Sequence, residues 1–216
     1  MSRVDKVPLR IAVDDAVELE AEWDVPTEPL VSIVFCHPNP LDGGTMHAPL
    51  MRTVTERLVD HGAAVLRFNF RGVGNSTGEH GRGVPEIHDV AAAVGEAGMR
   101  FDGGPVAVCG WSFGAVTALR WQAASGSQHP YVGIAPPVFK EGVPLLPAAP
   151  ELATTQRSFI LGDRDQFASV EDLARYAASI EASLTVLEGS DHFFYFREHK
   201  VVEAIVAALG ISPASA

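Results

Sequence analysis

A serine stands between two glycines at residues 110–114, which read Gly-Trp-Ser-Phe-Gly. A serine hydroxyl is a weak nucleophile at neutral pH, so it needs a general base that is itself oriented by a third group. The apolar run before the motif, 105–110, predicts a strand, and the small residues after it, 115–120, predict a helix. A Gly-x-Ser-x-Gly pattern in this context is typical of a nucleophile elbow, which holds the serine in a strained turn above a sheet. The pattern therefore predicts Ser112 as a nucleophile.

Two later segments supply the other residue types that such a serine needs. Asp163 and Asp165 follow the apolar run 158–161, and His192 follows the run 184–187. In folds of this kind the acid and the histidine come in that order, each after a later strand. We expect His192 to be the general base. Both aspartates qualify as the acid, and we favour Asp165 because it lies further from its strand and can reach back under the imidazole.

Acyl transfer also needs two N–H donors for the oxyanion of the tetrahedral intermediate. The residue after the nucleophile, Phe113, should give one backbone amide. The second should come from the loop at 37–46, where Pro38 and Pro40 have no N–H, so that Asn39 is the donor nearest the strand. The alternative is that this loop is a proline-rich connector without a catalytic part.

The elements that must position these side chains alternate between strands and helices. Strands are expected at 9–13, 17–23, 31–36, 64–70, 105–110, 131–135, 158–161 and 183–188. Helices are expected at 48–61, 85–98, 112–124, 169–181 and 197–209. This alternation predicts an α/β fold whose mostly parallel sheet has helices on both faces, with an N-terminal antiparallel hairpin at its edge. The length favours a single domain over residues 1–216.

Composition limits the classes of partner. The formal net charge of −11 disfavours nucleic acid and anionic membrane surfaces, and a small-molecule ester is the expected partner. No signal peptide or membrane span is visible, so a cytoplasmic location is expected. Cys36 and Cys109 lie in apolar runs and are expected to be buried thiols. The eight histidines lack metal-ligand spacing, so we expect no metal, and we expect no cofactor because acyl chemistry needs none. The number of subunits is left open.

Taken together, these segments resemble the α/β-hydrolase superfamily, and within it the small, capless, dienelactone-hydrolase-like serine esterases. The resemblance includes the His-Pro-x-Pro…Gly-Gly-Thr-Met loop at 37–46, the Arg-Gly-x-Gly-x-Ser loop at 71–76 and the Asp-His-Phe-Phe sequence at 191–194. It covers residues 7–209 and implies an eight-stranded sheet and a triad of Ser112, Asp165 and His192. Many relatives have His-Gly where this chain has His-Pro, and serine replaces cysteine at the nucleophile, so dienelactone substrates do not follow.

The expected function is that of a serine hydrolase, which cleaves carboxylic esters of small soluble substrates through an acyl-enzyme. About twenty residues separate Pro137 from the strand at Ser158, too few for a cap domain. Thioesterase, peptidase and acyltransferase activities would use the same triad and stay open, as does a non-catalytic interaction protein on the same scaffold. Trp111 could line the acyl pocket or pack against a neighbouring strand. The glycine-rich loop at 71–83 is expected to shape the pocket rim.

Overall fold

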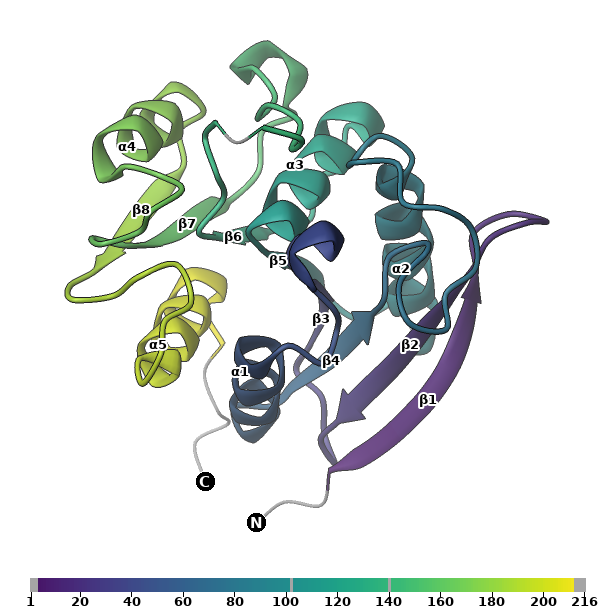
Figure 1. Ribbon diagram of the computed structural model, residues 1–216. Helices are drawn as coiled ribbons and strands as arrows, with labels where there is room; N and C mark the ends of the chain where they lie inside the picture. Colours follow the sequence, from purple (N-terminus) through teal and green to yellow (C-terminus); the bar gives the residue numbers. More distant parts are fainter. Residues whose placement is uncertain (1–3, 102, 140, 212–216) are drawn as a thin grey trace.

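The computed structural model describes residues 4–101, 103–139 and 141–211, and its described strands form one eight-stranded sheet (Figure 1). The strands are β1 (Asp5–Ala12), β2 (Glu18–Val25), β3 (Val31–Cys36), β4 (Ala63–Phe68), β5 (Val106–Trp111), β6 (Tyr131–Ile134), β7 (Arg157–Gly162) and β8 (Ser183–Leu187). The helices are α1 (Pro49–Asp60), α2 (Glu86–Arg100), α3 (Phe113–Ser125), α4 (Val170–Ser179) and α5 (Glu198–Leu209). Each lies within a few residues of its predicted range.

The strand order in the sheet is β1-β2-β4-β3-β5-β6-β7-β8. Strand β2 is antiparallel to both of its neighbours, while every pairing from β4 to β8 is parallel. The predicted fold class, a mostly parallel eight-stranded sheet with an antiparallel N-terminal hairpin, is confirmed. The extent of the single domain over residues 1–216 stays a prediction.

Helices cover both faces of this sheet, as expected for a parallel sheet whose central strands are continuous apolar runs. Helices α1 and α5 pack together on one face, and α2 and α3 pack together on the other (Figure 1). Helix α4 shares the face of α3. Tyr176 of α4 packs edge-on against Phe159, which packs edge-on against Tyr131, whose hydroxyl donates to the carbonyl of Ala115 on α3. Cys36 and Cys109 are buried free thiols in adjacent strands, as predicted.

Strand β4 ends at Phe68, two residues before the predicted end. Beyond it the backbone leaves the ladder of β3, and its amides find other acceptors. The amide of Asn69 donates to the carbonyl of Glu20 on β2, and the amide of Phe70 donates to the ring of His37. The apolar pattern could not show this, because Phe70 remains fully buried although it is no longer in the strand.

The connection from β6 to β7 contains one 3₁₀ helix, Ala149–Glu151, within its described part, and the fold has no lid. This confirms the prediction that no cap domain covers the carboxyl ends of the strands. None of the helices in the described ranges is long and apolar enough to cross a lipid bilayer.

Candidate active site

Ser112 lies in a tight turn between β5 and α3 and has φ 55° and ψ −120°. Such a backbone conformation is strained for any residue with a side chain, and it persists only where its surroundings enforce it. The glycines on either side allow the close approach that the turn requires. A Cβ at Gly110 would overlap the backbone of Gly114 and Ala115, and a Cβ at Gly114 would overlap the carbonyl of Cys36 on β3. These are the features predicted for a nucleophile elbow.

Asp165 and His192 are joined by a hydrogen bond of 2.8 Å between Oδ2 and Nδ1. The Asp165 side chain is fully buried, and its other oxygen accepts the amides of Phe167 and Ala168 at 2.7 and 3.0 Å. A carboxylate held in this way fixes the imidazole so that Nδ1 carries the proton and Nε2 is the free base. Asp163 does not contact the ring, and instead its Oδ1 accepts the amide of Ser190 at 3.2 Å.

Ser112 and His192 line the same cavity, which has a volume of about 440 Å³. Both residues are nearly buried, at 5% and 4% exposure. Within the described ranges no hydrogen bond joins the Ser112 hydroxyl to the His192 ring. Catalytic hydrogen bonds of this kind commonly tighten only when substrate binds. The structure thus places an oriented imidazole and a strained serine at one cavity.

The two amides predicted to bind an oxyanion, those of Phe113 and Asn39, donate to no protein acceptor in the part of the chain that the structure describes. Asn39 lines the cavity and begins a tight turn, in which its carbonyl accepts the amide of Gly44 at 2.9 Å. Its side-chain amide donates to Asp42 at 2.9 Å. A Cβ at Gly44 would overlap the carbonyl of Pro38, so the turn is closely packed.

His37, at the start of this loop, is a structural residue whose role the sequence did not reveal. It is fully buried, its Nδ1 lies 2.7 Å from the carbonyl of Pro38, and its Nε2 accepts the amide of Phe70 at 3.0 Å. These partners require a neutral ring with the proton on Nδ1. Burial lowers the pKa of His37 from 6.5 to about 4. A histidine directly after a strand was the available signal, but its partner Phe70, just beyond β4, is distant in the sequence.

The rest of the cavity is mostly apolar. Four aromatic side chains form one wall: Trp111, Phe167, Phe193 and Tyr195. The loop after β3 and the start of α1 form the other, and Asp42 supplies a carboxylate there. Among the described residues that line the cavity there is no lysine or arginine. Trp111 therefore does line the pocket, and its indole N–H also donates to the carbonyl of His192 at 3.2 Å.

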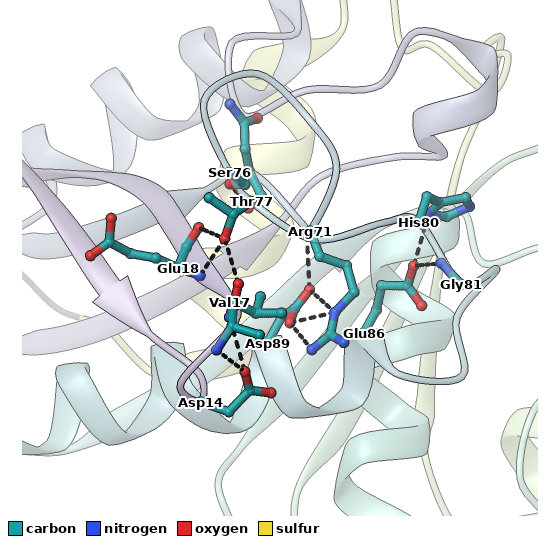
Figure 2. Close-up of polar contacts among 12 residues, drawn as sticks. Asp14, Val17, Glu18, Arg71, Ser76, Thr77, His80, Gly81, Glu86 and Asp89 are labelled. Atoms are coloured by element: carbon teal, nitrogen blue, oxygen red, sulfur yellow. Dashed lines mark hydrogen bonds and ion pairs between the residues drawn. The ribbon is translucent and has the colours of Figure 1, made fainter.

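The glycine-rich loop at 71–83 contributes none of the described residues that line the cavity, so its predicted place at the rim is wrong. Figure 2 shows where it lies: Arg71 forms a buried ion pair with Asp89 of α2, with N···O 2.6 Å, and Thr77 bonds the backbone of Glu18 on β2. Burial raises the pKa of Asp89 in spite of Arg71. These bonds fasten the loop to the hairpin and to α2.

The end of the same loop is held by Glu86, whose side chain is fully buried (Figure 2). Its two carboxylate oxygens accept the amides of Gly81 and Gly83 at 2.6 and 2.7 Å, and Nδ1 of His80 lies 2.8 Å away. The His80 ring packs on the ring of Phe113, with centroids 5.5 Å apart. This part of the loop therefore packs against the side chain of Phe113.

No group of three or more histidine, cysteine, aspartate or glutamate side chains in the described ranges could hold a metal ion. The residues at the cavity instead have the types and order of an acyl-transfer site: a strained serine, a histidine and a buried aspartate. They come from the ends of β5, β8 and β7, where the loops of a parallel sheet meet.

Comparison with known proteins identifies the family of the chain. The family described as alpha/beta hydrolase domain matches residues 31–205. An uncharacterised protein of Rickettsia prowazekii (strain Madrid E) is 31% identical in an alignment 203 residues long that covers 87% of this chain and 82% of that protein. A solved alpha-beta serine hydrolase homologue from Coxiella burnetii is 29% identical, with a TM-score of 0.81 over 97% of this chain and 98% of its own. A serine hydrolase without lid from Xanthomonas campestris is 26% identical, with a TM-score of 0.82 over 98% and 97%. The chain belongs to the alpha/beta hydrolase family.

Proposed function

We propose that this protein is a serine hydrolase that cleaves carboxylic esters through an acyl-enzyme. The observation that carries the proposal is that the strained Ser112 and His192 line one cavity, while His192 is hydrogen-bonded to the buried carboxylate of Asp165. A histidine with only a structural role would not need a buried carboxylate on Nδ1 while its Nε2 faces a cavity and accepts no hydrogen bond from the described residues. The two solved relatives described above are serine hydrolases by description, which supports the same chemistry here.

In the proposed reaction the Ser112 oxygen attacks the ester carbonyl carbon while Nε2 of His192 takes the hydroxyl proton. The carbonyl electron pair moves onto the oxygen, and the amides of Phe113 and Asn39 stabilise that oxyanion. The bond to the alcohol then breaks, and the imidazolium gives its proton to the departing alkoxide. Water repeats the sequence on the acyl-enzyme, which releases the carboxylic acid and restores Ser112. Asp165 stays ionised and stabilises the imidazolium.

The cavity favours small esters with an apolar group. Its volume of about 440 Å³ suits a compact substrate, and its aromatic wall suits an apolar group. Small esters that carry an apolar group are therefore the substrate class that we infer.

The test replaces Ser112 by alanine and measures hydrolysis of p-nitrophenyl acetate and covalent labelling by a fluorophosphonate. We expect Ser112→Ala to abolish both, because the variant lacks the hydroxyl that attacks in the proposed reaction. The control is Ser125→Ala, an exposed serine of α3 whose hydroxyl only bonds the carbonyl of Trp121, and it should keep wild-type rates. Retained turnover in Ser112→Ala would refute the assignment.

The same assay separates the alternatives. Labelling without ester turnover would point to an acyl substrate of another kind, and a panel of thioesters, amides and acyl acceptors would then identify it. Absence of labelling in the wild-type protein would favour a non-catalytic interaction protein on this scaffold.

A further inference from the structure

The loop that carries His192 has a backbone that needs external support. It runs from the end of β8 to the start of α5 at residue 198, and both Phe194 and Phe196 in it have positive φ, at 54° and 61°. Residues other than glycine adopt this conformation only when neighbouring contacts enforce it. Asp191 supplies one such contact, since its Oδ1 accepts the amides of Phe193 and Phe194, both at 3.0 Å. That contact is internal to the loop and does not fix its distance from Ser112.

Trp111 supplies a link across the site. It is the last residue of β5, directly before Ser112, and its indole N–H donates to the backbone carbonyl of His192 at 3.2 Å. The two residues are 81 positions apart in the chain. Trp111 is only 5% exposed, and its ring packs against the imidazole of His192 and edge-on against Phe193, with centroids 6.1 and 6.2 Å apart. The hydrogen bond therefore joins the nucleophile strand to the residue that must take the serine proton.

We propose that Trp111 is a positioning residue, whose indole N–H holds the His192 backbone at the correct distance from Ser112. This inference rests on the proposed function. Asp165 holds the imidazole at Nδ1, and Phe167 packs edge-on against the same ring with centroids 4.7 Å apart, but both contacts are made by the side chain of His192. The Trp111 bond is made by the backbone carbonyl of His192, so it holds the main chain of the same residue. Within the described ranges Ser112 and His192 form no hydrogen bond with each other. Small displacements of the loop therefore determine how readily that bond forms when substrate binds.

A different role for Trp111 makes a different prediction. If the indole is only a wall of the cavity, its loss weakens substrate binding and raises KM, while kcat stays unchanged. If it positions His192, loss of the N–H alone lowers kcat and leaves KM nearly unchanged, because the wall is still present. Misplacement of a catalytic group by about 1 Å can reduce a rate by about 100-fold.

The experiment compares three proteins with the wild type. Trp111→Phe removes the donor and keeps an aromatic ring. A second variant carries 3-benzothienylalanine at position 111, in which sulfur replaces the indole N–H, so that shape is kept if the phenylalanine variant folds poorly. The matched control is Trp23→Phe, which removes the indole donor of a fully buried tryptophan that bonds Glu96 at 3.3 Å, on β2 and away from the cavity. For each protein, kcat and KM for p-nitrophenyl acetate and the rate of fluorophosphonate labelling are measured.

We expect both position-111 variants to lose about 10- to 100-fold in kcat and in labelling rate, with KM within about threefold of wild type. Trp23→Phe should keep kcat within about twofold. The inference is overturned if the benzothienyl variant keeps wild-type kcat, or if KM rises while kcat does not fall. If the wild-type protein neither hydrolyses the ester nor is labelled, the proposed function fails and the inference fails with it, which is a distinct result.

Discussion

Asp163 and Asp165 stand two positions apart after the same strand, yet their carboxylates have different surroundings. Asp165 turns into the protein, where two backbone amides and the His192 ring surround its buried oxygens. Asp163 stays exposed and bonds the amide of Ser190, which helps to hold the beginning of the histidine loop. Both aspartates could be found in the sequence as candidates for the acid, and Asp165 could be favoured because it lies further from the end of its strand. It could not show the amides of Phe167 and Ala168, which orient the carboxylate.

At this scale we predict that Asp165→Asn lowers kcat by about 10³- to 10⁴-fold at neutral pH, because the asparagine amide can donate to Nδ1 and so favour the tautomer in which Nε2 is not a base. Asp163→Asn is the matched control, since its oxygen can still accept from Ser190, and it should stay within about threefold of wild type. Steady-state kinetics with p-nitrophenyl acetate provide the measurement. Equal losses in the two variants would contradict the assignment of the acid.

At the scale of elements, the site depends on how neighbouring strand ends are joined. The loop after β3 carries Asn39, and His37 fastens it to the chain beyond β4 through the amide of Phe70. The prolines of this loop, and hence Asn39 as the available donor, could be read from the sequence. The anchoring role of His37 could not, because it depends on the pairing of β3 with β4, which brings Phe70 beneath the ring. Local sequence patterns do not show which strands become neighbours in the sheet when those strands are distant in the chain.

Because the pKa of His37 is about 4 in the folded protein and 6.5 ordinarily, its stability contribution depends on pH. Between these values the unfolded chain binds the proton and the folded protein does not, so folding stability falls as pH falls from about 6.5 to about 4. On this basis the wild type loses about 2 kcal/mol from this group between pH 7 and pH 5. We predict that His37→Gln, although less stable at pH 7, loses about 2 kcal/mol less than wild type over that interval.

Urea unfolding at the two pH values measures this difference. The control is His199→Gln, which changes an exposed histidine of α5 and should show the wild-type pH dependence. A His37→Gln variant with the same loss as wild type would show that another group causes the pH dependence.

At the scale of the whole molecule, the order of the strands decides which loops reach the cavity. The cavity is lined from the ends of β3, β5, β7 and β8 and from the start of α1. Strand β4 lies between β2 and β3, so the glycine-rich loop that follows it is drawn toward the hairpin and α2 instead (Figures 1 and 2). The sequence predicted the strands, and the reactive residues that follow them, in their order along the chain. No local pattern shows that β4 lies beside β2 in the sheet while β3 lies beside β5. This is why the triad residues were found together and the loop at 71–83 was misplaced.

The absence of a lid predicts the substrate range. The short connection between β6 and β7 leaves the cavity uncovered, and its volume of about 440 Å³ accommodates a short acyl group. In a series of p-nitrophenyl esters we expect kcat/KM to be highest for acetate or butyrate and at least about tenfold lower for dodecanoate, since the added methylenes extend into water and add no buried contact.

A lidless site also has nothing to open at an interface, so the rate of hydrolysis should not jump when an ester exceeds its solubility. Assays on both sides of the solubility limit, with Ser112→Ala as the background, measure both properties. A kcat/KM that rises steadily with chain length, or a jump at the interface, would mean that an apolar surface beyond this cavity takes part in binding.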